Sequence, residues 1–179
     1  MRKYNHGPIA ALCACCLLAG AGPCRAACGE KARALVVKAF DAETHGAGKA
    51  EVLAGYDRAI AEDPGCSLAY SSRGAVYMSV DAAKAIADLT KAVQLDPSDV
   101  TAYFNRAGLY EDAGRRAEAL ADFDACLKLE TDAGSKRLDY YRRGKVYAAM
   151  GRSRRAVEDY TAVIKLGPGP EEHFAVPAE

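Results

Sequence analysis

The sequence has no surplus of charge of either sign, because its 24 lysines and arginines are matched by 24 aspartates and glutamates. The isoelectric point accordingly lies near 6.8. A protein that binds DNA or RNA contacts the phosphates through an excess of Lys and Arg on one face. The charge balance therefore argues against a nucleic acid as the main partner.

The sequence is also poor in residues that build metal and catalytic sites. It has only three histidines, which lie far apart: His6, His45 and His173. No pair of His or Cys residues has the spacing of a metal site. Residues 46–49 resemble part of a phosphate-binding loop, but that motif requires glycine in place of Glu43 and Ser or Thr in place of Ala50. We expect no cofactor, no metal and no enzymatic activity.

The sequence further lacks, at its N-terminus, the run of about 20 apolar residues that a membrane-spanning helix needs. The uncharged apolar run there, Ile9–Ala21, has 13 residues and follows a basic start at Arg2 and Lys3. Small residues suited to cleavage come next. Residues 1–26 are therefore predicted to be an export signal, which places the mature protein in the periplasm without a stable transmembrane anchor.

Two other interpretations of this segment stay open. The segment can form a buried N-terminal helix, although the Gly-Ala-Gly-Pro at residues 20–23 would break one. It can also be a lipoprotein signal, which needs an aliphatic residue three positions before the lipidated cysteine. Cys24 follows Pro23, however, and Cys28 has Arg25 at the aliphatic position.

The most informative feature of the sequence is a segment that recurs. Tyr77, Tyr110 and Tyr147 mark three copies, spaced 33 and 37 residues apart. Each copy has a tyrosine seven residues earlier, an arginine four residues earlier and a small residue three residues earlier: Tyr70, Tyr103 and Tyr140; Arg73, Arg106 and Arg143; Gly74, Ala107 and Gly144.

A second apolar run follows in each copy, with the spacings of three and four that are typical of a helix. The central copy runs from Tyr103 to Leu129 and has glycine at its midpoint, Gly114. Pro97 and Pro168 stand at the ends of two of these second runs, and Pro64 ends a similar run in an earlier, less regular copy; a helix cannot continue through proline. Each copy is therefore predicted to be a helix-turn-helix.

This pattern resembles the tetratricopeptide repeat, a helix-turn-helix unit of about 34 residues with small residues where its helices touch. The resemblance implies an all-α fold, a right-handed solenoid of about four antiparallel helix pairs over residues 28–168. The expected units are 30–66, 67–99, 100–136 and 137–168, the first of which matches only in its second helix. Residues 169–179, rich in proline, are predicted to be a disordered tail.

The repeated arginine has an aspartate partner in the second helix of each good copy. In an antiparallel helix pair the two side chains fall at nearly the same level. We predict three ion pairs that hold each pair in register: Arg73–Asp88, Arg106–Asp122 and Arg143–Asp159. The rival interpretation is a row of arginines that binds an acidic ligand.

The resemblance also implies a concave face, lined by the first helices, that holds an extended peptide or a partner helix. The residues that the repeat alignment places on it are Leu68, Ser71, Met78, Thr101, Phe104, Asn105, Glu111, Asp112, Leu138, Tyr141, Arg142 and Lys145. Phe104 and Tyr141 are the expected anchors, since large aromatics often anchor interfaces. The alternative is that they only shield the neighbouring helix.

One subfamily grips the C-terminal carboxylate of chaperone peptides through five Lys, Asn and Arg positions. Only Asn105 and Arg142 match here, which argues against that activity. The expected function is that of an adaptor or scaffold that binds another protein in the cell envelope. The alternative is a non-catalytic subunit that forms homo-oligomers through the last helix pair, because no polar capping helix follows it.

Four of the seven cysteines lie in or next to the predicted signal, and three lie in the repeats. Cys28 precedes the first helix and Cys66 opens the next unit, so both lie on the same edge of adjacent repeats. Export permits a Cys28–Cys66 disulfide. Two free thiols, or pairing with Cys24, stay open as alternatives. Cys126 occupies a small buried position and is expected to be inert.

Overall fold

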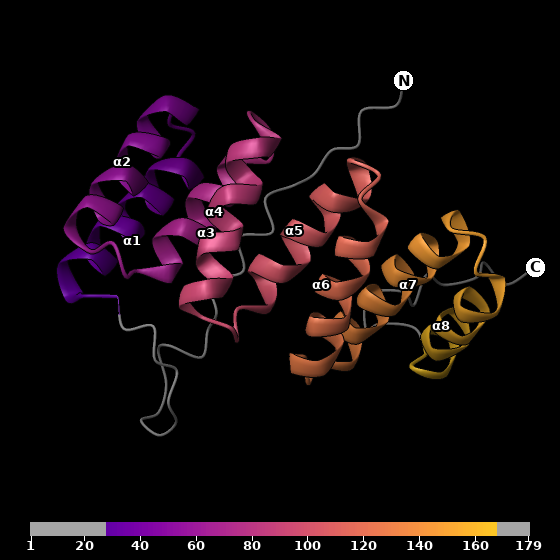
Figure 1. Ribbon diagram of the computed structural model, residues 1–179. Coiled ribbons are helices and arrows are strands. Elements are labelled where there is room, and N and C mark those ends of the chain that lie inside the picture. Colours follow the sequence, from indigo (N-terminus) through magenta and orange to yellow (C-terminus); the bar gives the residue numbers. More distant parts are fainter. Residues whose placement is uncertain (1–27, 168–179) are drawn as a thin grey trace, which may run out of the picture. The chain divides into compact units, whose positions relative to one another are not determined.

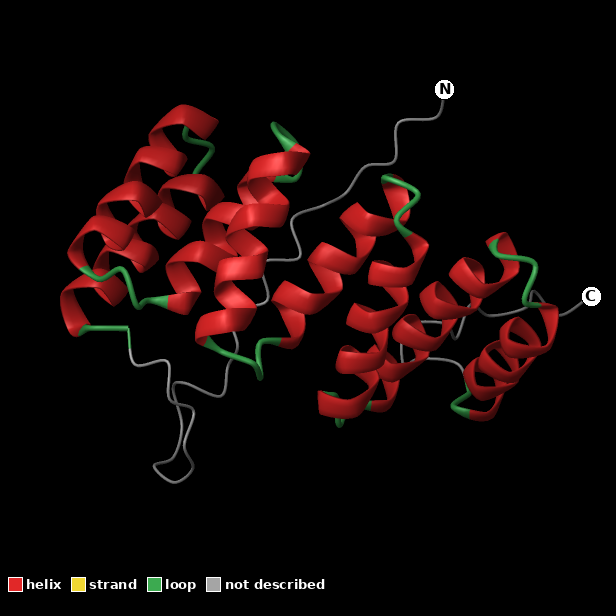
Figure 2. Ribbon diagram, in the orientation of Figure 1, coloured by secondary structure: helices red, strands yellow, loops and turns green. Residues whose placement is uncertain are grey.

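The computed structural model describes residues 28–167, so the predicted export signal and tail lie outside the described residues. These residues form eight helices and no strand (Figures 1 and 2). None of the eight is long and apolar enough to cross a membrane. The helices are α1 Glu30–Thr44, α2 Lys49–Glu62, α3 Ser67–Tyr77, α4 Ala82–Leu95, α5 Val100–Asp112, α6 Arg116–Leu129, α7 Ala133–Ala149 and α8 Ser153–Lys165.

The helices follow one another as helix-turn-helix pairs, and the all-α fold class expected from the repeat is confirmed. Within the described residues α1 packs on α2, α3 on α4 and α7 on α8, and successive pairs touch through α2 with α3 and α6 with α7. The chain divides into two compact units, residues 1–106 and residues 107–179. Each unit is described by itself below.

Glycine makes the sharp turn in the third and fourth pairs. Gly114 and Gly151 have φ angles of 71° and 69°, in the left-handed region that favours glycine. Arg115 N–H then donates to the Tyr110 carbonyl at 2.8 Å, and Arg152 N–H donates to that of Tyr147 at 2.9 Å. This pattern satisfies carbonyls that the end of a helix would otherwise leave open. The turn between α3 and α4 has no glycine, and Asp81 caps α4 instead by accepting from the Lys84 N–H.

Small residues allow the helices of a pair to approach closely. A Cβ atom added to Gly74 would lie 2.9 Å from Leu89 Cγ, and one added to Gly144 would lie 2.8 Å from Tyr160 Cε1. Both distances are shorter than a carbon–carbon contact allows. The glycines three residues before the marker tyrosines therefore fix how tightly α3 packs on α4 and α7 on α8.

The first helix pair lacks the tyrosine and small-residue marks but still packs as a pair. Its core is built from small and branched side chains around Tyr56, which is almost fully buried and hydrogen-bonded to Glu43 and Ser72. Burial, with Glu43 nearby, raises the pKa of Tyr56 to about 12. The phenol therefore stays protonated and bridges α2 to its neighbours α1 and α3.

The helix α7 begins at Ala133, four residues before the unit boundary that the repeat pattern suggests. Asp132 caps it by accepting a hydrogen bond from the Ser135 N–H at 2.7 Å. The three extra residues of the link between the last two copies are therefore not a longer loop. They extend α7 by nearly one turn at its N-terminus.

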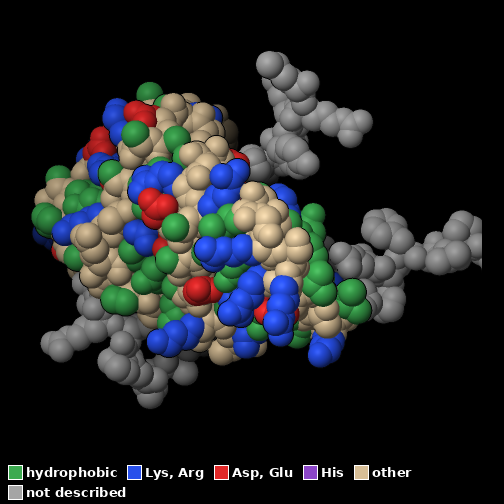
Figure 3. All heavy atoms as spheres, turned by 45° about the vertical axis from the view of Figure 1, so that its right-hand side comes forward, with side chains coloured by type: hydrophobic (Ala, Val, Ile, Leu, Met, Phe, Trp, Pro, Cys, Tyr) green, Lys and Arg blue, Asp and Glu red, His purple; other side chains and the backbone are tan. Residues whose placement is uncertain are grey.

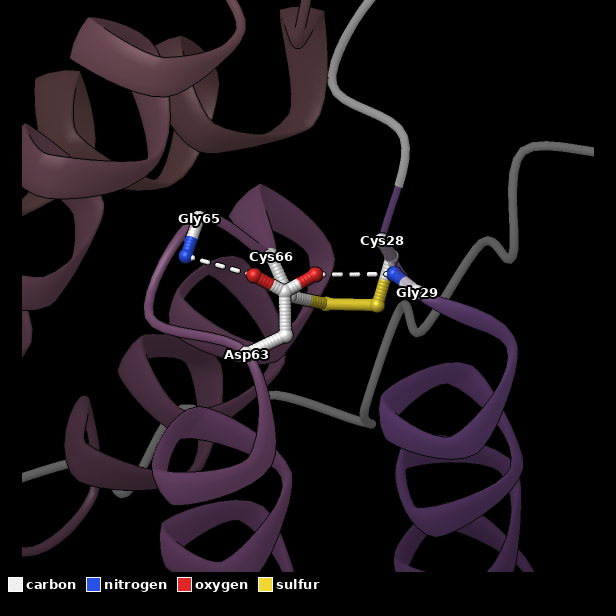
Figure 4. The surroundings of a disulfide bond; sticks show 5 residues. All are labelled: Cys28, Gly29, Asp63, Gly65 and Cys66. Atoms are coloured by element: carbon white, nitrogen blue, oxygen red, sulfur yellow. Dashed lines mark hydrogen bonds between the residues drawn. A yellow bond between two sulfur atoms is a disulfide. The ribbon is translucent and has the colours of Figure 1, made fainter.

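A disulfide ties the first helix pair to the second. Cys28 and Cys66, which come just before α1 and α3, are bonded with an S–S distance of 2.09 Å (Figure 4). Asp63 lies beside them and accepts hydrogen bonds from the Gly29 N–H at 2.8 Å and the Gly65 N–H at 2.9 Å. These two bonds lower the pKa of Asp63. The bonds hold the start of α1 against the α2–α3 turn.

Replacing both Cys28 and Cys66 by serine is expected to lower the free energy of unfolding by about 2–4 kcal/mol, because the bond closes a loop in the unfolded chain. Urea denaturation of the oxidised protein measures the difference. Reduction of the wild type should lower its stability by a similar amount, whereas the double-serine protein should not respond to the reductant. Equal stability of the two oxidised proteins would contradict the expectation.

Candidate functional site

The repeated arginine of α3 is clamped between two second helices. Arg73 Nε and Nη2 donate to the two oxygens of Asp88 on α4, at 2.7 and 2.8 Å. Its Nη1 donates to Asp57 Oδ1 on the preceding α2, at 2.6 Å. The hydrogen bonds that Arg73 donates to Asp88 raise the pKa of Arg73 above its usual range, against the opposing effect of burial. All three guanidinium nitrogens are therefore hydrogen-bonded within the scaffold.

The second unit repeats this arrangement on α7. Arg143 Nε and Nη2 donate to Asp159 on α8, at 2.9 and 2.6 Å, and its Nη1 donates to Asp124 on α6, at 2.6 Å. In the first unit Arg106 Nη1 donates to Thr90 Oγ1 on α4, at 3.0 Å. Asp122 is buried on α6. Its pairing with Arg106 stays a prediction.

Tyrosines flank the clamped arginines. The Arg73 guanidinium lies 5.7 Å from the ring centre of Tyr70 and 5.9 Å from that of Tyr77. Arg143 lies at 5.5 and 5.8 Å from Tyr140 and Tyr147. A cation within about 6 Å of an aromatic ring is attracted to it. In these two copies the tyrosine and arginine marks therefore form one cluster, and the geometry favours a structural role over an acidic-ligand site.

Sequence reasoning missed the partners that the arginines have in the preceding repeat. These partners are Asp57, Thr90 and Asp124. Each directly follows a large buried residue of a second helix, Tyr56, Leu89 or Phe123. This shared position is the sequence signal that could have identified the three partners. A polar residue that directly follows a core residue in a helix lies at the edge of the packed face.

The first unit holds six of the residues expected on the binding face, and they differ in exposure. Met78 is exposed, and Thr101, Phe104 and Asn105 are partly buried. Leu68 packs against the core cluster of the first helix pairs. Ser71 corrects the expectation, because it is only 7% exposed and hydrogen-bonded to Asp99, which caps the start of α5. Its hydroxyl therefore stabilises the scaffold.

The second unit holds the other six, and most of them form a continuous group. Glu111 on α5 accepts hydrogen bonds from Arg142 at 3.2 Å and from Lys145 at 3.1 Å, both on α7. Tyr141 is 48% exposed, and Leu138 is exposed one turn before it. The remaining residue, Asp112, is exposed at the end of α5. We call Glu111, Leu138, Tyr141, Arg142 and Lys145 the α7 face.

The α7 face combines an exposed apolar surface with a charged network. The Tyr141 ring lies 6.2 Å from that of Tyr160 on α8, so it is supported on one side and open on the other. Glu111 holds the side chains of Arg142 and Lys145 in place, and the three groups together carry a net positive charge. Such a face suits a peptide that has an apolar side chain next to a carboxylate.

Basic side chains gather at the α7–α8 turn. A shallow open depression there is lined by Arg152, Arg154 and Arg155 together with the clamped Arg143. Glu158 pairs with two of them, Arg154 at 3.4 Å and Arg155 at 3.4 Å. Figure 3, which turns the α7–α8 end toward the viewer, shows Lys and Arg side chains among hydrophobic ones. Because these charges are exposed and partly neutralised, we assign them no site.

The polar side chains of the described residues serve mainly in ion pairs and helix caps. Within residues 28–167, no group of three or more His, Cys, Asp or Glu side chains is arranged to hold a metal ion. Repeated helix pairs with clamped arginines and variable exposed side chains define a helical-repeat scaffold.

The repeats match a known family. Models of the tetratricopeptide repeat match residues 81–135 and residues 140–169. The chain belongs to the tetratricopeptide repeat family. This family is in general non-catalytic and binds other proteins.

Several known proteins are similar to parts of the chain. Human tetratricopeptide repeat protein 28 is 41% identical over 69 residues, which are 38% of this chain and 3% of that protein. Mouse serine/threonine-protein phosphatase 5 is 27% identical over 86 residues, 48% of this chain and 17% of that protein. The crystal structure of MamA is 25% identical, covers 73% of this chain and 74% of its own, and has a TM-score of 0.65. The chain thus covers only a small part of the two curated relatives, protein 28 and phosphatase 5.

A double-mutant cycle on Arg73 and Asp88 tests the structural role of the clamp. We expect Arg73→Gln or Asp88→Asn to lower the free energy of unfolding by about 2 kcal/mol, because either leaves a half-buried charge without its bidentate partner. The coupling between the two substitutions should be about 1–2 kcal/mol. Chemical denaturation of the four proteins measures it.

The matched control is the exposed end of the same clamp. Asp57 is largely exposed, so Asp57→Asn should cost less, about 0.5 kcal/mol. Additive effects of Arg73→Gln and Asp88→Asn would contradict the structural role.

Proposed function

We propose that the protein is an adaptor that binds an extended peptide or a partner helix on the exposed faces of its first helices. In the second unit the α7 face would make the contact. In the first unit Met78 and Phe104 would contribute. The observation that carries the proposal is the exposure of Tyr141, a large aromatic residue that is 48% exposed. It lies beside Leu138 and the ion pairs that Glu111 makes with Arg142 and Lys145.

The exposed residues differ between copies whereas the packing residues repeat. The positions of Tyr141 in α7 and Phe104 in α5 correspond to Ser71 in α3, which is turned into the scaffold. Partner choice in this proposal therefore rests on α5 and α7. Aromatic residues of this kind supply much of the binding energy of protein interfaces.

We further propose that the protein acts in the cell envelope after export. The basic start and the short apolar run of residues 1–26 support this, as does the Cys28–Cys66 disulfide, since disulfides persist in oxidising compartments. The phosphatase among the relatives carries no weight for the function proposed here, because the similarity covers 17% of that protein.

A second candidate function is self-association through the last helix pair. Val157 and Ile164 lie two turns apart on α8 and are 62% and 78% exposed, which is unusual for branched apolar side chains. A mass that rises with concentration in light scattering, and falls to that of a monomer in Ile164→Asp, would favour this function over the adaptor.

Replacing both Phe104 and Tyr141 by alanine is expected to weaken partner binding at least about 30-fold, because two anchor side chains are lost. Crosslinking in intact cells followed by affinity capture and mass spectrometry identifies the partner, and titration of the purified pair measures the affinity. Tyr141→Ala alone should give a clear loss without lowering the melting temperature by more than a few degrees.

Arg155→Ala is the control, since the Arg155 side chain is also open to solvent but lies outside the α7 face. It should bind like the wild type. If the Phe104 and Tyr141 variants capture the same proteins with the same affinity as the control, binding on these faces is wrong.

A further inference from the structure

A buried carboxylic acid lies at the junction of α6 and α7. Asp139 is only 3% exposed, and among the described residues its Oδ2 atom has no hydrogen-bond partner. An unsatisfied polar atom in a protein interior costs free energy, and a buried charge costs more. No part of the scaffold described above requires this residue to be an acid.

Comparison between the copies shows that Asp139 departs from the rule of the repeat. The residue just before the first tyrosine of each copy is a fully buried alanine in α3 and α5, Ala69 and Ala102, but aspartate in α7. The small buried position of the preceding second helix changes at the same junction. It is alanine at Ala59 and Ala92 and cysteine at Cys126, which is also fully buried.

The charged group at the end of α6 opposes a negative charge on Asp139, and the nearby cation has other partners. Glu130, at the end of α6, repels it, and the Cys126 thiol lies within its electrostatic reach on α6. Arg143, one turn later on α7, attracts it, but this arginine is already bound to Asp159 of α8 and to Asp124.

Burial first, and then Glu130, raise the pKa of Asp139 to about 7, and Arg143 partly offsets them. The carboxyl is therefore neutral in mildly acidic solution and ionises near neutrality. The other charged groups of α5 and α7 named above are Glu111, Arg142 and Lys145, and these form ion pairs with one another.

We propose that the α6–α7 junction is a pH-sensitive contact, tight when Asp139 is neutral and weakened when Asp139 is ionised, so that the α7–α8 pair loosens from α6. The sign follows from linkage. The folded protein holds the proton to about pH 7, whereas the unfolded chain releases it near pH 3.8. The stabilisation by the neutral acid is complete below pH 4, declines as pH rises and is lost above pH 7.

The first test compares melting temperatures at pH 5.5 and pH 8, a window in which ordinary carboxylates stay ionised. The wild type should lose about 5 °C more than Asp139→Asn between these values, because the amide cannot ionise. Asp139→Ala, which restores the residue of the other copies, should behave like Asp139→Asn. Asp112→Asn, an exposed acid in the same unit, should follow the wild type. An equal pH dependence of wild type and Asp139→Asn overturns the proposal.

A second measurement needs no variant. The side-chain carboxyl resonance of Asp139 in the intact protein should titrate with a midpoint near pH 7. A midpoint near pH 4 contradicts the proposal even if the substitutions prevent folding.

The third readout locates the change at the junction. Disulfide-exchange labelling of Cys126, quantified by peptide mass spectrometry at pH 8, should be several-fold faster in the wild type than in Asp139→Asn. The Cys126 thiol is buried on α6 within electrostatic reach of Asp139, so faster labelling reports opening of the packing around this acid. Equal labelling rates would show that ionisation does not open the junction.

Discussion

The rest of the scaffold depends on the clamped arginine. A guanidinium offers donors in a planar fork, and Arg73 uses it to join two successive second helices through Asp88 and Asp57. Arg143 joins Asp159 and Asp124 in the same way. Each clamp therefore sets the register within one helix pair and between that pair and the one before it. Loss of the arginine or of the aspartate in its own helix pair leaves a half-buried charge without its bidentate partner.

The clamp also determines which side chains remain for recognition. Because arginine, tyrosine and the small residue of each first helix are used in packing, the faces between them are free to vary. On α7 those positions hold Tyr141, Arg142 and Lys145, the last two bonded to Glu111. On α3 the position that corresponds to Tyr141 is Ser71, which is buried and hydrogen-bonded to Asp99 instead. The units are built alike but do not offer the same surface.

The regular part of this structure was predictable from the sequence because it repeats. Helix pairs, turn glycines and the aspartate partners of Arg73 and Arg143 in their own pairs follow from the spacing of three copies. The backward partners Asp57 and Asp124 were missed, since the register between one repeat and the next is set by packing and not by the period of either helix. The burial of Ser71 was missed for a related reason, because it depends on Asp99, which caps the first helix of the next pair.

The acid at Asp139 was hidden from pattern reasoning in a different way. Polar residues are expected on solvated helix faces, and Asp139 stands where the other copies bury alanine. Only the packed structure shows that its Oδ2 lacks a partner among the described residues. The repeat pattern therefore does not predict this buried acid, which is found where one copy departs from the pattern.

The central claim is that the exposed face of the first helices, and not another surface, meets the partner. A photoreactive phenylalanine analogue placed at residue 141, and in a matched protein at residue 155, tests it in the cells that make the protein. The account predicts a defined crosslinked partner from position 141 and none of that species from position 155. The same crosslinked species from both positions, or from position 155 alone, would contradict it.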